Sequence, residues 1–330
     1  LSCAQWGYTR NAGWRPGSRP RSGVRAICRE CAAWPGDRPG DRIERAWALN
    51  LARRHGQRGA GRLPWRVLYD ELQQLWRLRE LLAVLARREL GARTAGSAGG
   101  WLWVWLPPLL TTAAYFLLFD VVFGMRLGAA APTARVGTFL VVGMLAWSAF
   151  ADATQRGMMS LLEAGGLLHK NPLPPALFPA RAVLASGVVF APLLLALLPL
   201  YMGAHQWRAG VWALLPLLLL QGRLSFLLAY LLAILAAALR DVVQGVQLLL
   251  SLGVFLSPVL FPLTLFPERW RWLLWLNPMT APVLGYQAAL LQGQWPPPAV
   301  WLALAAWIGL LALLLSLAVA RSRDQLVDWL

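Results

Sequence analysis

Residues 300–320 read VWLALAAWIGLLALLLSLAVA, twenty-one residues without a single charge. A helix needs roughly 20 apolar residues to cross a bilayer core about 30 Å thick, so this stretch alone predicts a membrane span. The remaining sequence agrees, because 58% of the 330 residues are hydrophobic, 14% are charged and the mean hydropathy is +0.51. A soluble domain carries about 25% charged residues. We therefore expect an integral membrane protein.

Five more apolar segments precede this stretch as candidate spans. They are Trp101–Phe123, Gly137–Phe150, Ala176–Tyr201, Val211–Leu239 and Val242–Phe261. The second is short and crosses only if its helix continues through Asp152 and Gln155. Phe266–Gly293 is too polar for a full crossing and favours a re-entrant or interfacial hairpin between spans five and six. The predicted fold class is an all-α integral membrane protein with six transmembrane helices in residues 101–320.

The basic residues are concentrated at the start of the chain. Residues 1–100 hold 19 of the 31 Lys and Arg residues and 8 of the 15 Asp and Glu residues, a net charge of +11. Cytoplasmic segments carry the excess of Lys and Arg, so we expect both the N-terminus and the C-terminal tail, residues 321–330, in the cytoplasm. The charge excess is thus a topology signal, and we expect no nucleic-acid partner.

The basic head divides into two parts. Residues 1–62 are rich in Arg, Gly and Pro without apolar periodicity, and we expect a disordered or non-native extension in which Cys28 and Cys31 are incidental thiols. Residues 63–100 instead place leucines at three- to four-residue spacing. This pattern predicts a cytoplasmic amphipathic interface helix, with Arg87, Arg88 and Arg93 towards the anionic inner leaflet. Packing on a soluble partner is the alternative.

The sequence lacks the motifs of a self-contained enzyme. The single lysine, Lys170, precedes Asn171, so the chain has no P-loop, which needs Lys followed by Ser or Thr. No HExxH motif occurs, and residues 101–320 contain no adjacent pair of acidic residues. We expect no catalytic residue, no metal site and no cofactor in this chain.

Aromatic and charged residues inside the apolar segments are candidates for a conduit. They are Trp101, Trp105, Tyr115, Trp147, Phe150, Asp152 and Arg223. The aromatic residues either form a belt at the membrane interface or line a path along which sugar rings slide. Asp152 and Arg156 lie one helical turn apart and can pair locally. Arg223 has no acidic neighbour within a turn, so it needs a partner on another helix or a polar lumen.

Two polar segments are candidates for contacts at the inner side. Residues 157–179 predict a Pro-rich loop with a short helix, which suits contact with a cytosolic motor; an ordinary connector is the alternative. The candidate residues of this segment are Glu163, His169, Lys170, Asn171 and Pro174, and their contact with a motor is what the family resemblance described below implies. Arg240 and Asp241 form a charge pair at the end of the fourth span, where they can cap the turn between two helices.

Several short motifs, taken in order, resemble the permease subunit of ABC-2 type exporters of the polysaccharide and polyol-phosphate class. They are Leu81–Arg93 followed by residues 97–101, Gly143–Trp147, Leu167–Lys170 with Leu173–Pro174, Arg240–Asp241, Ser257–Pro258 and Asn277–Pro278. The sequence departs from the family pattern at Thr94 and Gly99, where Tyr and Leu are usual, and at Leu173, where Phe is usual. The resemblance covers about residues 75–330.

The resemblance implies a homodimer, each copy docked to a separate subunit that binds ATP and Mg²⁺. It implies export of a lipid-linked polysaccharide, such as O-antigen, capsule or a teichoic-type chain, across the bacterial inner membrane. Trp272, Trp275, Asn277 and Pro278 would belong to an outer gate. A permease for drugs or lipids, or a membrane enzyme of glycan assembly, are the alternatives.

Overall fold

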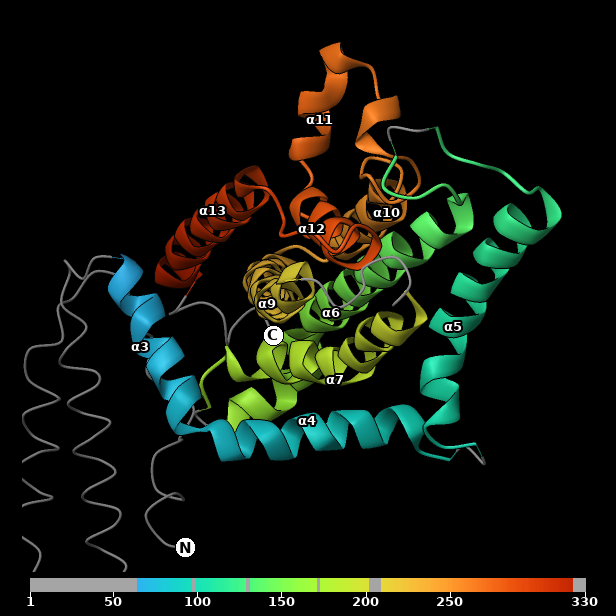
Figure 1. Ribbon diagram of the computed structural model, residues 1–330. Helices are drawn as coiled ribbons and strands as arrows, with labels where there is room; N and C mark the ends of the chain where they lie inside the picture. Colours follow the sequence, from blue (N-terminus) through green and yellow to red (C-terminus); the bar gives the residue numbers. More distant parts are fainter. Residues whose placement is uncertain (1–63, 97–98, 129–130, 171–172, 202–208, 323–330) are drawn as a thin grey trace, which may run out of the picture. The chain divides into compact units, whose positions relative to one another are not determined.

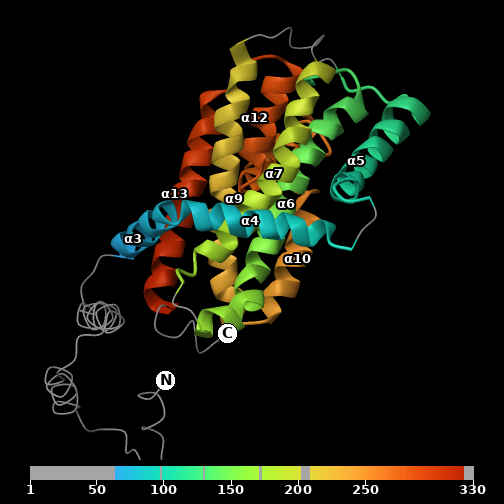
Figure 2. The same ribbon diagram turned by 90° about the horizontal axis from the view of Figure 1, so that it is seen from below.

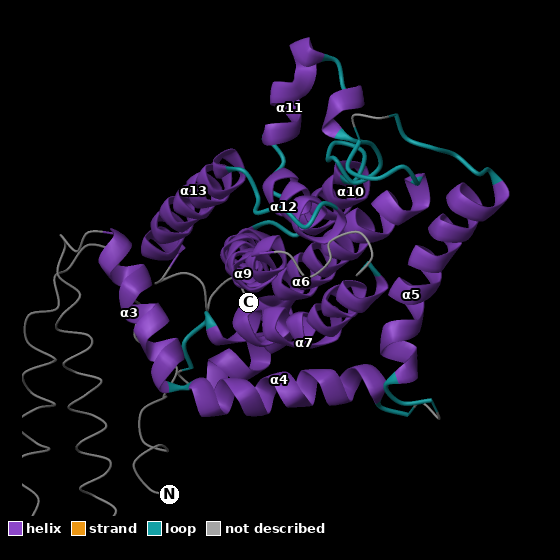
Figure 3. Ribbon diagram, viewed as in Figure 1, coloured by secondary structure: helices purple, strands orange, loops and turns teal. Residues whose placement is uncertain are grey.

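The computed structural model describes residues 64–96, 99–128, 131–170, 173–201 and 209–322, all within one compact unit that begins at Arg62. Within these residues the regular structure is helical, apart from an isolated bridge between Arg126 and Arg135 (Figure 3). Residues 1–62, with Cys28 and Cys31, and nearly all of the 321–330 tail lie outside the described residues. The all-α prediction is therefore confirmed for the described part of the chain.

The helices follow one another in this order along the chain (Figure 1). They are α3 (Pro64–Arg77), α4 (Arg79–Thr94), α5 (Leu102–Phe116) with its π-helical continuation η1 (Leu117–Val122), α6 (Val136–Lys170), α7 (Leu177–Leu200), η2 (Ala209–Ala213), α9 (Leu214–Ala238), α10 (Asp241–Gly253), η3 (Leu263–Leu265), η4 (Glu268–Trp270), α11 (Arg271–Trp275), α12 (Thr280–Leu291) and α13 (Pro298–Ser322).

Five helical segments of the described chain are long and apolar enough to cross a membrane. They are Leu102–Val122, Val136–Leu168, Leu177–Leu200, Gly210–Ala238 and Pro298–Ser322. The fifth expected span, Val242–Phe261, is different, because α10 has only 13 residues and rises about 20 Å. Residues 254–260 then leave the helix as turns before Pro262. A crossing by Val242–Phe261, and with it the total of six spans, therefore stays a prediction.

α6 is the central helix of the bundle. It packs against α7 and α9, and α13 packs on the far side of α9 (Figure 2). The largest fully buried side chains include Phe139 of α6, Tyr230 of α9 and Tyr286 of α12. α12 is buried along almost its whole length, so residues expected in a re-entrant hairpin are part of the core.

The predicted loop at residues 157–179 is wrong over most of its length. α6 continues without interruption to Lys170, and α7 already begins at Leu177. No proline occurs between Val136 and Lys170, and the backbone donors of this stretch therefore stay free to continue the helix. The connection is consequently short, and the polar residues before it lie on an extended helix.

The predicted interface segment forms two helices instead of one. The break falls at Leu78, whose backbone leaves helical geometry with φ −96° and ψ 19°. α3 packs against α13, whereas α4 crosses α7 (Figure 2). Because the two halves bury their leucines against different partners, a straight helix does not satisfy both. Arg87 and Arg88 are exposed, and their contact with the lipid leaflet stays a prediction. For Arg93 the prediction is wrong, because its side chain is only 7% exposed and bonds to Asp152 and Ser186.

Candidate functional site

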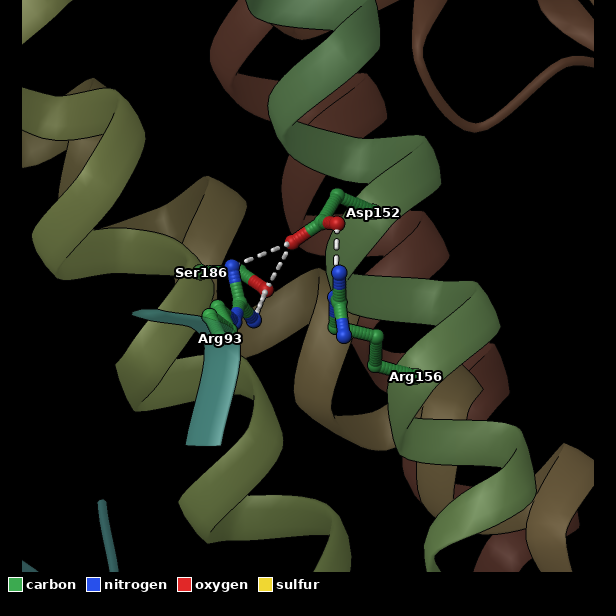
Figure 4. A network of polar contacts seen from close by, with 4 residues as sticks. All are labelled: Arg93, Asp152, Arg156 and Ser186. Carbon is green, nitrogen blue, oxygen red and sulfur yellow. Dashed lines mark hydrogen bonds and ion pairs between the residues drawn. The ribbon is translucent and has the colours of Figure 1, made fainter. Parts of the chain in front are cut away.

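Three helices meet in a polar niche around Asp152 of α6, formed with Arg93, Arg156 and Ser186 (Figure 4). Asp152 Oδ1 accepts a hydrogen bond from Arg156 Nε at 2.8 Å, one turn along α6. Its Oδ2 accepts hydrogen bonds from Ser186 Oγ of α7 and, at 3.2 Å, from Arg93 Nη1 of α4. Arg93 Nη2 also donates to Ser186 Oγ, at 3.1 Å. One carboxylate thus holds α4, α6 and α7 together.

The two arginines of the niche differ in exposure. The side chain of Arg93 is 7% exposed and that of Arg156 is 44% exposed. Burial lowers the pKa of Arg93, while the Asp152 carboxylate opposes that shift and stabilises the charged form. Arg93 Nε is buried without a hydrogen-bond partner. Two cations thus share the Asp152 carboxylate, and Glu89, which lines the adjoining cavity, also stabilises the charged form of Arg93.

A cavity of about 500 Å³ opens beside this niche, between α4, α5, α6 and α7. Its polar wall includes Ser148, Asp152 and Arg156, and its opposite wall includes Trp103 and Thr111 of α5. In the described part of the chain no three His, Cys, Asp or Glu side chains lie close enough to hold a metal ion. The cavity therefore presents charged and hydrogen-bonding side chains, and α5 forms one of its walls.

The conduit candidates on α5 lie at the edge of the bundle. Trp101 is exposed, and its ring lies 6.1 Å from that of the half-buried Trp105. Trp105 packs near Leu90 and Phe190, with its Nε1 buried and lacking a hydrogen-bond partner. Tyr115 is half-buried and stacks on Phe119 at 6.3 Å. These residues are partly available to a partner or ligand, and a conduit role stays a prediction.

The other conduit candidates occupy different environments. Trp147 and Phe150 are buried in the hydrophobic core of the single chain, with ring centroids 5.7 Å apart. Arg223 is exposed on α9, and no described residue forms an ion pair with it. The structure therefore places Asp152 at the cavity beside α5, whereas Arg223 does not line that cavity and forms no ion pair with Asp152.

The expected motor contacts lie at one end of α6. Glu163 is exposed on the extended helix, and Pro174 is half-buried in the connection to α7. His169 and Lys170 belong to α6 while their side chains, like Asn171, lie outside the described residues. Arg240 and Asp241 are exposed at the start of α10, in the adjoining turn after α9. No ion pair joins these two charges, although Asp241 lies in the first turn, where an acidic side chain stabilises a helix.

Asn277 is the organising residue of the expected outer gate. Its Nδ2 donates to Gly253 O at 3.0 Å and to Leu256 O at 3.4 Å, and its Oδ1 accepts from Met279 N at 3.0 Å. Trp275 O accepts a hydrogen bond from Trp307 Nε1 of α13 at 3.2 Å. Pro278 is half-buried and Trp272 is exposed.

Buried hydrogen bonds of two glutamines, which the sequence did not predict, lie inside the bundle. Gln221 Nε2 donates to Ala146 O at 2.9 Å, and Gln221 Oε1 accepts from Tyr286 Oη at 2.7 Å. Gln287 Nε2 donates to Pro258 O at 2.7 Å. A glutamine within the run LLLLQGR at residues 217–223 is a signal for such a contact, because a buried amide needs partners. For Ser186, in contrast, nothing in the sequence indicated its hydrogen bond to Asp152.

Comparison of the sequence with known families defines the class of membrane protein. The family model for ABC-2 type transporters matches residues 80–291, and the chain belongs to this family. It is consequently a multi-pass membrane protein of a family of transport permeases.

Three relatives carry more specific names. The chain is 34% identical over 238 residues to the O-antigen export system permease protein RfbA of Myxococcus xanthus, covering 71% of this chain and 89% of that protein. It is 24% identical to a protein of the same name from Klebsiella pneumoniae, over 65% of this chain and 81% of that one. It is 25% identical to the polysialic acid transport protein KpsM of Escherichia coli, over 72% and 91%.

Proposed function

We propose that this chain is the permease subunit of an ATP-driven exporter that moves a lipid-linked polysaccharide from the cytoplasmic side outward across the bacterial inner membrane. The observation that carries this proposal is the similarity, across 71% of the chain, to a permease named for O-antigen export. A second relative is named for polysialic acid transport, so the shared substrate class is a polysaccharide. This substrate class is preferred over drugs or lipids on that ground.

In this proposal two copies form the conduit, each bound to a separate ATP-binding subunit that holds ATP and Mg²⁺. Within one chain only 6% of the apolar spanning segment that contains α5 is buried, against 67% of that of α6. This weak packing of α5 supports the dimer. The conduit would lie along α5. Six crossings, with the turns after α10 completing the fifth, keep both termini in the cytoplasm, and the segment from Pro262 to Gly293 gates the outer end.

The extension of α6 is the proposed lever between the motor and the conduit. A helix is stiff along its axis, so a push near Glu163 reaches Asp152 three turns away. Asp152 is bonded to Arg93 and Ser186, and movement of α6 therefore acts on α4 and α7 together. The cavity beside α5 is the place where that movement changes the path for substrate.

Deletion of the gene followed by glycan tracking tests the proposal. We expect completed lipid-linked polymer to accumulate on the cytoplasmic side, and the wild-type gene to restore surface polymer. The variant with Glu163→Lys and Lys170→Glu should insert normally yet export less polymer and copurify poorly with the ATP-binding subunit. Glu268→Lys, an exposed acid outside the proposed motor contact, is the matched control for copurification. Normal surface glycan after deletion, with no compensating exporter, would refute polysaccharide export.

A further inference from the structure

An apolar groove runs between α7 and α9 and has not been assigned a role. Ala149 and Ala153 of α6 form its floor, and Leu75, Trp76 and Arg79 close one end at the junction of α3 and α4. Its volume is about 850 Å³. The groove extends along α7 from Ala180 to Leu194, about 21 Å of helix. That length suits one leaflet of a bilayer core, about 15 Å, plus its interface.

Two glycines, Gly187 and Gly222, line the groove. A methyl group added to Gly187 of α7 or Gly222 of α9 meets no atom within 4 Å. The side chains around them are apolar and exposed, including Leu184, Val188 and Leu219. Both glycines therefore face open space, into which a larger side chain at either position could extend.

Two of the polar side chains along the groove, Ser186 and Gln221, are already bonded within the chain. Ser186 Oγ donates to Asp152, and both ends of the Gln221 amide are bonded, to Ala146 O and Tyr286 Oη. An ordered water needs two to four polar partners, and an apolar cavity binds hydrocarbon instead. In a membrane protein the available hydrocarbon is the lipid acyl chain.

The closed end of the groove has the chemistry of an anionic headgroup site. Trp76 is 72% exposed, and Arg79 Cζ lies 5.6 Å from the centre of its ring. Arg79 is exposed, and no described residue forms an ion pair with it. Trp and Arg are the residues that hold a protein at the lipid headgroup level, and basic residues there attract anionic lipid.

We propose that this groove binds one acyl chain of an anionic glycerophospholipid of the bilayer, with the lipid phosphate on Arg79. The lipid would brace the junction of α3 and α4 against α7 and α9. A resident bilayer lipid is favoured over the transported molecule, because Ser186 and Phe190 separate the groove from the cavity that α5 completes. This inference is independent of the exported substrate.

Native mass spectrometry of the protein purified in mild detergent tests the proposal. We expect the wild type to retain one phospholipid per protomer and to regain it from micelles of phosphatidylglycerol in preference to phosphatidylcholine. The variant Gly187→Leu/Gly222→Leu fills the groove and should lower occupancy at least tenfold. Gly309→Leu of α13, another helical glycine with nothing within 4 Å, should leave occupancy unchanged. Arg79→Glu should abolish the preference for phosphatidylglycerol, whereas Arg87→Glu, which lies outside the groove, should not.

A second measurement keeps the proposal testable if the double glycine variant fails to fold. A phosphatidylglycerol with a photoreactive acyl chain should label peptides containing Leu184 and Leu219 of the wild type, and should not label that containing Leu313 of α13. Equal lipid occupancy in the wild type and a folded double variant, or uniform photolabelling, would overturn the site. Equal uptake of the two phospholipids would overturn the role of Arg79. Recovery of a lipid-linked glycan from the groove would overturn the assignment to a bilayer lipid.

Discussion

Among single residues, Asp152 has the largest number of dependent contacts in the niche. Replacing it with Asn keeps its shape but removes the charge opposite the buried Arg93. An uncompensated buried charge is strongly unfavourable, so we expect Asp152→Asn to lower the free energy of unfolding by about 2–3 kcal/mol. Equilibrium unfolding in detergent micelles, followed by tryptophan fluorescence, measures this change. Glu163→Gln, an exposed acid on the same helix, should change it by less than about 0.5 kcal/mol, and equal effects would contradict the role of the niche.

A pair of glycines in α10 tests the packing of Trp147. A methyl group at Gly253 would lie 2.7 Å from Trp147 Cη2, and the buried indole has little room to move. We expect Gly253→Ala to destabilise the protein by about 1–3 kcal/mol. Gly245→Ala on the same helix meets nothing within 4 Å, and should be neutral or stabilise by up to about 1 kcal/mol through helix propensity. The melting temperature of Gly253→Ala should be clearly lower than that of Gly245→Ala. Equal melting temperatures would show that the Trp147 side chain moves aside at no cost.

At the residue scale the sequence predicts contacts that are local and misses those that are distant. The pairing of Asp152 with Arg156 follows from their i,i+4 spacing on one helix and is confirmed. The contact of Asp152 with Ser186 joins residues 34 apart, and the contact with Arg93 joins residues 59 apart. Such contacts depend on how α4, α6 and α7 pack together, and no spacing along the chain encodes that packing. The site was thus predictable in its charges but not in its assembly.

At the scale of elements, Asn277 joins the end of α10 to the start of α12. Asn277→Asp keeps the oxygen that accepts from Met279 N but replaces the donor that faces Gly253 O and Leu256 O. Carboxylate facing two carbonyl oxygens is repulsive, so we expect a loss of about 1–3 kcal/mol and faster amide hydrogen exchange at residues 253–262. Gln292→Glu, at the other end of α12, is a control with the same change of charge. Unchanged exchange in Asn277→Asp would show that the hydrogen bonds do not hold these elements together.

Hydropathy along the sequence correctly predicted the helices whose limits are set by a long apolar segment. The segment expected at Ala176–Tyr201 is the helix Leu177–Leu200, and that at Val300–Ala320 is Pro298–Ser322. Both agree because a chain in hydrocarbon must satisfy its backbone within each segment. The break at Leu78 and the length of α6 were not predicted, since they depend on the neighbours of a helix rather than on its composition.

For the whole molecule, the burial of the spans is uneven. α5 and α13 lie at opposite edges of the bundle (Figure 1). About 28% of the apolar spanning segment of α13 is buried within the chain, against 6% of the segment that contains α5. α13 is braced by α9, α12 and α3, whereas α5 contacts mainly α6 and the end of α4. A span with so few contacts in its own chain is the element that a second copy would complete.

Disulfide cross-linking in native membranes tests that assembly. The three cysteines, Cys3, Cys28 and Cys31, would first be replaced with Ser, so that each introduced thiol is single in its chain. We expect cysteines scanned through residues 109–118 to form dimers with a period of three to four residues, because one face of α5 would meet its copy. Exposed positions of α13, such as Leu310 and Leu314, should give no dimer. Dimers from α13 but not from α5 would place the contact between copies at α13. That result would contradict the proposed conduit along α5.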